Sequence, residues 1–263
     1  MDYVIDGNTA LVAASSSGLG KASAEALARE GVNVVLNGRD PDRLNAAMKE
    51  LQSVATGAVR GEQGDLTNAD DIDRIVDRTV AEFDSLDHLV TNAGGPPSGA
   101  FLEMNEEDWY DAFDLLVMSA VRLIRESAPH LREGTGGTIV TITSRSVKEA
   151  IPSLVLSNAV RMSVIGLEKT LSEELAPEVR SNAVLPAPHE TDRQQELIQA
   201  AVDRGEFDDY EEGLEAKGTL NPLGRIGDPS ELGNVVAFLS SERSSFLNGV
   251  AVPVDGGQSA SNL

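Results

Sequence analysis

Short apolar runs rich in β-branched residues alternate with segments of helical spacing along almost all of this 263-residue chain. The apolar runs lie at 9–13, 32–37, 86–90, 137–143, 179–185 and 249–254, with a weaker one at 57–62. The helical segments lie at 21–30, 43–54, 69–83, 106–131, 157–175 and 229–240. Strands that are apolar on both faces and separated by helices form parallel sheets covered on both sides. The alternation therefore predicts an α/β fold with a parallel sheet at its centre.

About seven strands and a glycine-rich first turn select one architecture among the α/β folds. A TIM barrel of this length needs eight strand–helix units, whereas an open doubly wound sheet does not. No linker or repeat divides the chain, and its 41% hydrophobic content is enough for a sizeable core. We expect one Rossmann-like, three-layer α/β/α domain over 1–263.

One acidic, proline-punctuated segment, 186–227, interrupts the alternation. It carries helical stretches near 194–203 and 208–216. An insertion after a late strand of an α/β sheet commonly lies over the ligand crevice. We therefore expect 186–227 to act as a substrate lid.

The chain is strongly acidic, and this excludes several classes of function. Forty-three acids against 21 bases leave a net charge of −22, which would repel nucleic-acid phosphates and anionic lipid headgroups. There is no cysteine, so disulfides and thiolate chemistry are excluded. Only five of the bases are lysines, and an acid-rich, lysine-poor composition is typical of proteins that work in molar salt. With no basic leader or apolar run of bilayer length, we expect a cytoplasmic protein of a halophilic host, with a small-molecule substrate and no nucleic-acid or membrane partner.

The first apolar run leads directly into the string AASSSGLG (13–20) and then into a helical segment. Gly18 and Gly20 would let backbone amides approach a pyrophosphate at the positively polarised N-terminus of that helix. The hydroxyls of Ser15 and Ser17 would donate to phosphate or cap the helix. Two glycines are a weak signal, and an ordinary tight turn is the alternative. The strand before the turn and the helix after it favour a dinucleotide site.

Several further motifs complete a pattern that resembles the short-chain dehydrogenase/reductase family over essentially the whole chain. They are AASSSGLG at 13–20 for the family's TGxxxGxG, Asp65 after the third strand, TNAG at 91–94 for NNAG, Ser144 after the fifth strand, PAPHET at 186–191 for PGxxxT, and VDGG at 254–257. Ala13 and Ala14 depart from the family's Thr and first Gly, a small change that still admits a nucleotide. The resemblance implies a nicotinamide cofactor and lies nearest to the 3-oxoacyl-(acyl-carrier-protein) reductases.

The same resemblance implies roles for individual residues. Asp65 would hydrogen-bond the adenine amine, the stretch 92–94 would line the adenosine ribose, and Thr191 would contact the nicotinamide end. The implied cofactor-binding residues are Ser15, Ser17, Gly18, Leu19, Gly20, Arg39, Asp65, Leu66, Asn92, Ala93, Gly94, Arg161, Pro186, His189 and Thr191.

The end of the second strand bears on the choice between NAD and NADP. Members of the family that prefer NAD carry an acid there, which would repel a 2′-phosphate. This chain has Gly38 followed by Arg39, whose guanidinium can hold a phosphate through paired charge-assisted bonds. The alternative is that Arg39 is a solvated charge paired with Asp40 or Asp42. We favour NADP(H), with NAD(H) possible.

The catalytic positions depart furthest from the family, which uses a Ser, a Tyr four residues before a Lys, and an Asn. Only Ser144 matches; Ser157 and Arg161 stand at the Tyr and Lys positions, and Leu116 stands at the Asn position. Ser157 and Arg161 lie one helical turn apart on one face. A serine hydroxyl is a far weaker acid than a tuned phenol, and an arginine cannot exchange its proton near neutrality. Arg161 can supply only electrostatic work, on ribose hydroxyls or on an oxyanion.

Two nearby residues are candidates for a displaced proton donor. Lys148 follows the strand that ends at Ser144, and a partly desolvated lysine can titrate near neutrality. The alternative to a catalytic role is that Lys148 forms a solvated ion pair with Glu149 at the surface. His189 lies where the family covers the nicotinamide, and a structural loop role is the alternative for it. Arg145 and Ser146 could orient a polar group of the substrate, although nothing in the sequence singles them out.

Two classes of function follow from this site. The first is an NAD(P)-dependent oxidoreductase of a small carbonyl or alcohol, similar to the 3-oxoacyl reductases, with Ser144, Ser157, Arg161 and Lys148 as catalytic candidates. The second is a cofactor-binding protein without turnover, acting as a sensor or assembly partner. No metal site is expected, because no His, Asp and Glu residues stand at ligand spacing. The resemblance implies a homo-oligomer, a dimer or a homotetramer, built on the long helices flanking the fifth strand.

Overall fold

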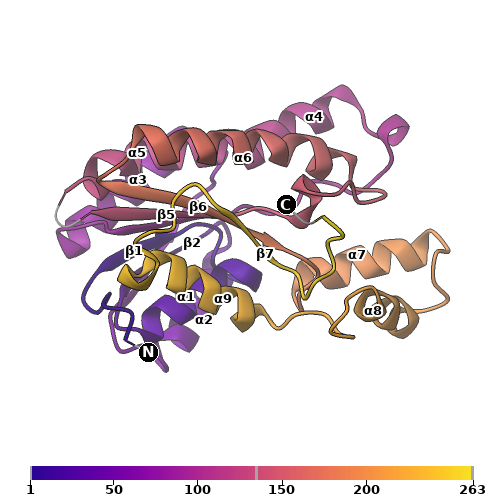
Figure 1. Ribbon diagram of the computed structural model, residues 1–263, viewed down its shortest axis with the longest axis horizontal. Helices are drawn as coiled ribbons and strands as arrows, with labels where there is room; N and C mark the ends of the chain where they lie inside the picture. The colour runs from indigo at the N-terminus through magenta and orange to yellow at the C-terminus, as the bar shows by residue number, and fades with distance from the viewer. Residues whose placement is uncertain (1, 134–135, 262–263) are drawn as a thin grey trace.

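The computed structural model describes residues 2–133 and 136–261 as a parallel sheet between two layers of helices (Figure 1). The seven strands run in the order β3-β2-β1-β4-β5-β6-β7. They are β1 (Thr9–Val12), β2 (Asn33–Gly38), β3 (Val59–Gln63), β4 (His88–Thr91), β5 (Gly137–Ile142), β6 (Val179–Pro186) and β7 (Ala251–Val254). The predicted single-domain, doubly wound Rossmann-like fold is confirmed, including the weak third strand.

Nine α-helices are assigned in the described residues: α1 (Gly18–Arg29), α2 (Pro41–Gln52), α3 (Ala69–Phe83), α4 (Glu106–Phe113), α5 (Ser119–Leu131), α6 (Val155–Glu174), α7 (Asp192–Asp203), α8 (Tyr210–Thr219) and α9 (Pro229–Ser240). Figure 1 places α1, α2 and α9 on one face of the sheet and α3, α5 and α6 on the other. Strand β1 shows how the sequence feeds both layers, because Ala10 and Val12 enter one core cluster and Leu11 enters the other. No helix in the described ranges is long and apolar enough to span a membrane.

Side-chain caps fix where most of the helices begin. Asp40 caps α2 by accepting from two backbone amides, with Pro41 at the first helical position. Asp228 and Glu231 form a capping box at α9, again with a proline after the cap. Caps of this kind explain why the predicted helix starts lie within a few residues of the observed ones.

The predicted helical segment over 106–131 is confirmed, and it contains a π-helical turn at Asp114–Met118, between α4 and α5, that the sequence did not indicate. The two helices bury their apolar sides against different neighbours. Ala112 and Leu116 belong to a cluster with α6, whereas Leu123 and Ile124 pack against the sheet. The wider turn changes the phase of the helix, so both apolar sides are buried. Apolar periodicity alone does not reveal such a change of phase.

The segment 186–227 lies beyond the carboxyl end of the sheet and carries α7 and α8 (Figure 1). Asp192 at the start of α7 forms an ion pair with Arg43 of α2. The chain reverses its direction of travel across the sheet between β1 and β4, and ligands of open α/β sheets bind outside the strand ends at such a point. The predicted nucleotide turn and the fifth-strand serine both belong to this region.

Candidate active site

The turn between β1 and α1 is built around a strained alanine. Ala14 has φ +46°, in the left-handed region that glycine adopts without cost. Two asparagines hold its backbone there: its N–H donates to Asn37 Oδ1 at 3.2 Å, and its carbonyl accepts from Asn92 Nδ2 at 3.2 Å. Asn92 comes from the end of β4 and Asn37 from β2. The turn is therefore tied to both neighbouring strands before any ligand binds.

Gly20 is required by close packing. A Cβ on this residue would lie 2.5 Å from the carbonyl oxygen of Ala14 and 2.7 Å from Asn92 Nδ2. Gly18 has φ +58°, and its Cα faces the side chain of Thr191 across the crevice. Glycine is therefore required at position 20 by close packing and favoured at position 18 by the positive φ.

The N-terminus of α1 has free amides. Ser17 is its N-cap residue, and the Ser17 side chain makes no capping hydrogen bond, in contrast to the caps of α2, α3 and α7. Unpaired amides at a helix N-terminus bind anions, and the adjacent Leu19 is only partly buried, so its backbone is approachable. These features fit the pyrophosphate of a dinucleotide.

The expected role of the Ser15 hydroxyl is corrected. Ser15 is fully buried; its Oγ donates to the Val12 carbonyl at 2.6 Å and accepts from the Asn37 N–H at 3.0 Å. Its only proton is committed to the protein, so it cannot donate to phosphate. It ties the turn to β2 instead.

The end of β2 presents a guanidinium to solvent. The side chain of Arg39 is 77% exposed, and its Nη1 lies 4.0 Å from Asp65 Oδ2. The high exposure agrees with the alternative of a solvated charge, but in the described ranges its ion pair is with Asp65 rather than Asp40 or Asp42; Asp40 instead caps α2. A Cβ on Gly38 would lie 2.9 Å from the Ser16 Cβ, so an acidic side chain at this position would crowd the phosphate turn.

The residues expected along the adenosine lie at the ends of β3 and β4. Asp65 Oδ1 accepts from the backbone and hydroxyl of Thr67, at 2.9 and 2.8 Å. Leu66 is 6% exposed and belongs to the core, so only its backbone can face a ligand. Ala93 packs against the α4–α6 cluster, whereas Gly94 is exposed with open space around it.

The string 186–191 leads from β6 into α7. His189 is buried, and its Nδ1 lies 2.7 Å from the Ala187 carbonyl, so Nδ1 carries the proton and Nε2 is the basic nitrogen. Burial lowers its pKa below the ordinary value of 6.5. The ring packs on Gly227. Together with Ala187 and Asp255 it lines a cavity of about 280 Å³. Thr191 caps α7.

Ser144, at the end of β5, has a hydroxyl that is partly committed. Its Oγ accepts from the Ser146 N–H at 3.1 Å, which leaves its own proton free for another acceptor. Within the described residues no hydrogen bond joins it to Ser157 of α6. The Ser157 Oγ lies 3.1 Å from the Ser146 Oγ, and both of these serines are buried. Ser146 therefore links the other two serines, because its N–H donates to Ser144 and its hydroxyl pairs with that of Ser157.

Arg161 reaches from α6 to the same strand end. Its Nη1 donates to the carbonyl of Thr143, the residue before Ser144, at 3.3 Å. Its Nε is buried and has no hydrogen-bond partner among the described residues. Burial first, and then the neighbouring charge of Arg193, lower its pKa to about 10, so it remains a cation at neutral pH.

Lys148 makes no ion pair within the described part of the chain. Glu149, its alternative partner, pairs with Arg145 Nη1 at 3.3 Å and accepts from the backbone N–H of Ser261 at 3.1 Å. The ammonium group of Lys148 is therefore not neutralised by Glu149. Leu116, at the position of the family's asparagine, is buried in the π-helical turn.

The sequence reasoning missed Arg193 and Asn37. Arg193 is the first base in an acidic segment, and its Nη2 donates to the Pro96 carbonyl at 2.7 Å, which brings it to the end of β4. Asn37 is a polar residue that ends an apolar strand, and both of its amide atoms are used within the turn and β3. The sequence signal for Arg193 was a base within an acidic segment, and the signal for Asn37 was an amide at the end of an apolar strand.

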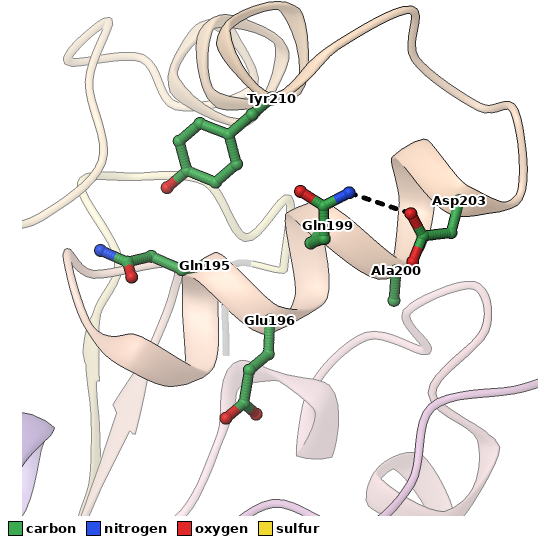
Figure 2. A pocket seen from close by; sticks show the side chains of 6 residues that line it. All are labelled: Gln195, Glu196, Gln199, Ala200, Asp203 and Tyr210. Carbon is green, nitrogen blue, oxygen red and sulfur yellow. Dashed lines mark hydrogen bonds between the residues drawn. The ribbon is translucent and has the colours of Figure 1, made fainter.

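A groove lies away from these residues, between α7 and α8 (Figure 2). It has a volume of about 700 Å³ and is lined mainly by amide and carboxylate side chains. Figure 2 shows Gln199 bonded to Asp203 and the Tyr210 ring facing across from α8. None of the predicted site residues lines it. In the described ranges no group of three His, Asp or Glu side chains is arranged to hold a metal ion.

Known proteins similar to this chain fall in one group. A family model described as enoyl-(acyl carrier protein) reductase matches residues 13–259. The human dehydrogenase/reductase SDR family member 4 is 31% identical over 94% of this chain and 86% of that protein. The 3-oxoacyl-(acyl-carrier-protein) reductase of Thermotoga maritima is 29% identical over 96% of this chain and 98% of that protein. L-sorbose reductase from Gluconobacter frateurii, solved with NADPH and L-sorbose, superimposes with a TM-score of 0.93 at 30% identity, covering 99% of this chain and all of that one.

Proposed function

The chain belongs to the short-chain dehydrogenase/reductase family of oxidoreductases, and on that premise we propose that it transfers hydride between NADP(H) and a small carbonyl or alcohol substrate. The observation that carries the proposal is the hydroxyl of Ser144. It follows the carboxyl end of β5, makes no donated hydrogen bond within the described residues, and lies at the same end of the parallel sheet as the turn whose uncapped α1 N-terminus and close-packed Gly20 suit a dinucleotide. A hydroxyl fixed in this way can donate to a carbonyl oxygen as negative charge develops on it.

Two local features support NADP(H) over NAD(H). Arg39 presents an exposed guanidinium at the end of β2, and its nearest acid is at 4.0 Å, so a phosphate could displace that weak contact. The crowding of Gly38 by Ser16 disfavours the acidic side chain that would grip ribose hydroxyls. The sorbose reductase that superimposes on this chain was solved with NADPH.

The protein's own groups suggest a division of labour. When bound, the nicotinamide supplies or accepts the hydride. Ser144 donates a hydrogen bond to the reacting oxygen, and the cation of Arg161 behind it stabilises negative charge there without giving up a proton. Ser157, paired with Ser146, can present its hydroxyl as a second donor. Lys148, with no acid paired to it in the described residues, is the group we assign as proton donor.

We also propose that 186–227 acts as the lid over this site. Arg193 of α7 contacts the end of β4, and Thr191 faces Gly18, so the segment borders both halves of the crevice. The exposed apolar side chains of Phe113 and Met162, at 43% and 50%, support a dimer or tetramer built on α4–α6. The halophilic host, the cytoplasmic location and a 3-oxoacyl substrate remain predictions from the sequence.

The alternative function is tight cofactor binding without turnover, and a specific observation favours it: the tyrosine and lysine positions hold Ser157 and Arg161, neither of which can replace a tuned phenol. The discriminating experiment mixes the protein with NADPH and a broad panel of ketones, and with NADP and the alcohols, and follows cofactor absorbance. Turnover that is lost on Lys148→Ala supports the enzyme. Binding without turnover, converted into activity by Ser157→Tyr with Arg161→Lys, would establish a vestigial site.

Cofactor choice is tested separately by Arg39→Gln. Losing a charge-assisted contact with a phosphate should weaken NADPH binding about tenfold and leave NADH binding unchanged. Isothermal titration with each cofactor measures both affinities. An equal loss for the two cofactors would remove Arg39 from 2′-phosphate recognition.

A further inference from the structure

Arg161 is a partly buried cation without a counter-ion among the described residues. In that part of the chain no acid lies within ion-pair distance of it, its buried Nε has no hydrogen-bond partner, and its Nη1 donates to a neutral carbonyl. A desolvated charge that lacks a counter-ion destabilises the folded protein. The chain carries 43 acids, so the absence of an acid beside Arg161 in the described structure does not result from a shortage of acidic residues.

A second cation lies at the end of the neighbouring strand, because Arg193 contacts the loop after β4, which pairs with β5, and Arg161 contacts the residue after β5. Arg193 is in the first turn of α7, and the charge of Arg193 is felt by Arg161 strongly enough to lower its pKa. Its Nη2 is held by the Pro96 carbonyl, and a Cβ on Gly95 would lie 2.7 Å from its Nε, so the guanidinium lies flat against the loop after β4. Its own acid, Glu196, is 66% exposed and three residues away on the same helix.

The electrostatics of this arrangement are unfavourable by themselves. Two like charges repel, and Arg193 is also placed at the positive end of α7, where anions rather than cations are stabilised. The solvent-exposed contact with Glu196 offsets little of this repulsion. A small anion between the two guanidinium groups would remove the repulsion and give Arg161 its missing partner.

We propose that Arg161 and Arg193 form a carboxylate subsite, and that the substrate is an oxo acid, or the corresponding hydroxy acid, bound as its free carboxylate. The proposal rests on the proposed function, whose substrate class it names. Arg161 binds the Thr143 carbonyl, next to Ser144, which places the subsite beside the reacting oxygen. A neutral ketone or a thioester would leave Arg161 without an anionic partner and Arg193 with only its exposed contact to Glu196.

The test compares each free acid with its methyl ester, using pyruvate and acetoacetate with saturating NADPH. The wild type should favour the acids in kcat/KM, and Arg193→Gln should lower kcat/KM for the acids about ten- to a hundredfold while changing that for the esters little. Arg193→Lys, which keeps the charge, should recover part of the loss. Arg204→Gln is the matched control, because Arg204 ends the same helix and pairs only with nearby Glu206 in the described structure.

A binding measurement separates this proposal from the proposed function. Calorimetry with malonate and dimethyl malonate on the NADP complex should show binding of the diacid alone, weakened at least about tenfold by Arg193→Gln. Malonate binding without turnover of any carbonyl would sink the oxidoreductase and keep the subsite. Turnover of the esters at the same kcat/KM as the acids would keep the oxidoreductase and overturn the carboxylate subsite. An equal loss of NADPH affinity in Arg193→Gln would assign the anion to the cofactor's phosphates and overturn the subsite.

Discussion

The two halves of the crevice differ in how their polar groups are paired. At the β1–α1 turn, Ser15, Asn37 and Asn92 spend their hydrogen bonds on the backbone, and the ligand-binding groups are main-chain amides. At the ends of β5 and α6, the corresponding work falls to side chains with unfilled capacity: the Ser144 proton and the Arg161 guanidinium. The side chains of the nucleotide half are therefore hydrogen-bonded within the protein before a ligand binds. In the catalytic half, Ser144 and Arg161 can form further hydrogen bonds with a ligand.

The largest effect is expected from Ser144→Ala. Removing one donor from a developing oxyanion costs about 10²–10³ in kcat, or roughly 3–4 kcal/mol. Because Ser144 is not part of the turn scaffold, the NADPH affinity and the free energy of unfolding should change little. Steady-state kinetics and cofactor titration on the same preparation measure both. A comparable loss of cofactor affinity would break the division between the two halves.

A second prediction concerns Glu168, a buried acid on the same helix as Ser157 and Arg161. It accepts hydrogen bonds from Thr141 and Ser181, yet burial raises its pKa from 4.5 to about 7. Its burial therefore costs little well below pH 4.5, where it is protonated in both states; the cost grows as pH rises from 4.5 to about 7 and is constant above that. Two to three pKa units correspond to about 3 kcal/mol above pH 7.

Glu168→Gln should remove that cost. Relative to the wild type, the variant's free energy of unfolding should rise between about pH 5 and about pH 8 and coincide with it at the acid end. Urea unfolding at several pH values measures the difference, from which the other titrating groups cancel. A difference that does not vary with pH would show that Glu168 is ionised throughout this range.

The scaffold itself is probed by Gly20→Ala, whose added Cβ would overlap the Ala14 carbonyl. Overpacking of this kind costs about 1–3 kcal/mol in stability and should also abolish tight NADPH binding, because the turn must move. Gly166→Ala in α6 is the matched control, since a Cβ there meets nothing within 4 Å. Thermal unfolding with and without NADPH compares the two. Unchanged cofactor binding in Gly20→Ala would mean that the turn is not a fixed scaffold.

The smallest effect is expected from Ala14→Gly. The positive φ of Ala14 stores about 1 kcal/mol that glycine would release, partly offset by the greater entropy of glycine in the unfolded chain. The variant should be equal to the wild type or more stable by less than about 1 kcal/mol, with NADPH affinity retained. A marked destabilisation would contradict the strain assigned to this position.

The fold could be predicted because strand alternation, helix caps and the Gly18–Gly20 turn are local signals that agree with one another. The site could be predicted only in part. The glycines and Ser144 stand at motif positions, but the pairing of Ser157 with Ser146, and of Ser15 with β2, depends on how separate elements pack. Arg193 was missed because its significance comes from the neighbouring charge of Arg161, which lies on another helix. The π-helical turn at 114–118 likewise follows from tertiary packing.

That π-helical turn has a consequence for how this chain tolerates change in length. Each residue of an α-helix advances the chain by about 100°, so deleting one residue within Asp114–Met118 would restore regular winding and rotate α5 by that amount relative to α4. Leu123 and Ile124 would then leave the sheet and turn toward solvent. The extra residue therefore acts as a phase shifter for the whole second helix, and single deletions there should be far less tolerated than substitutions.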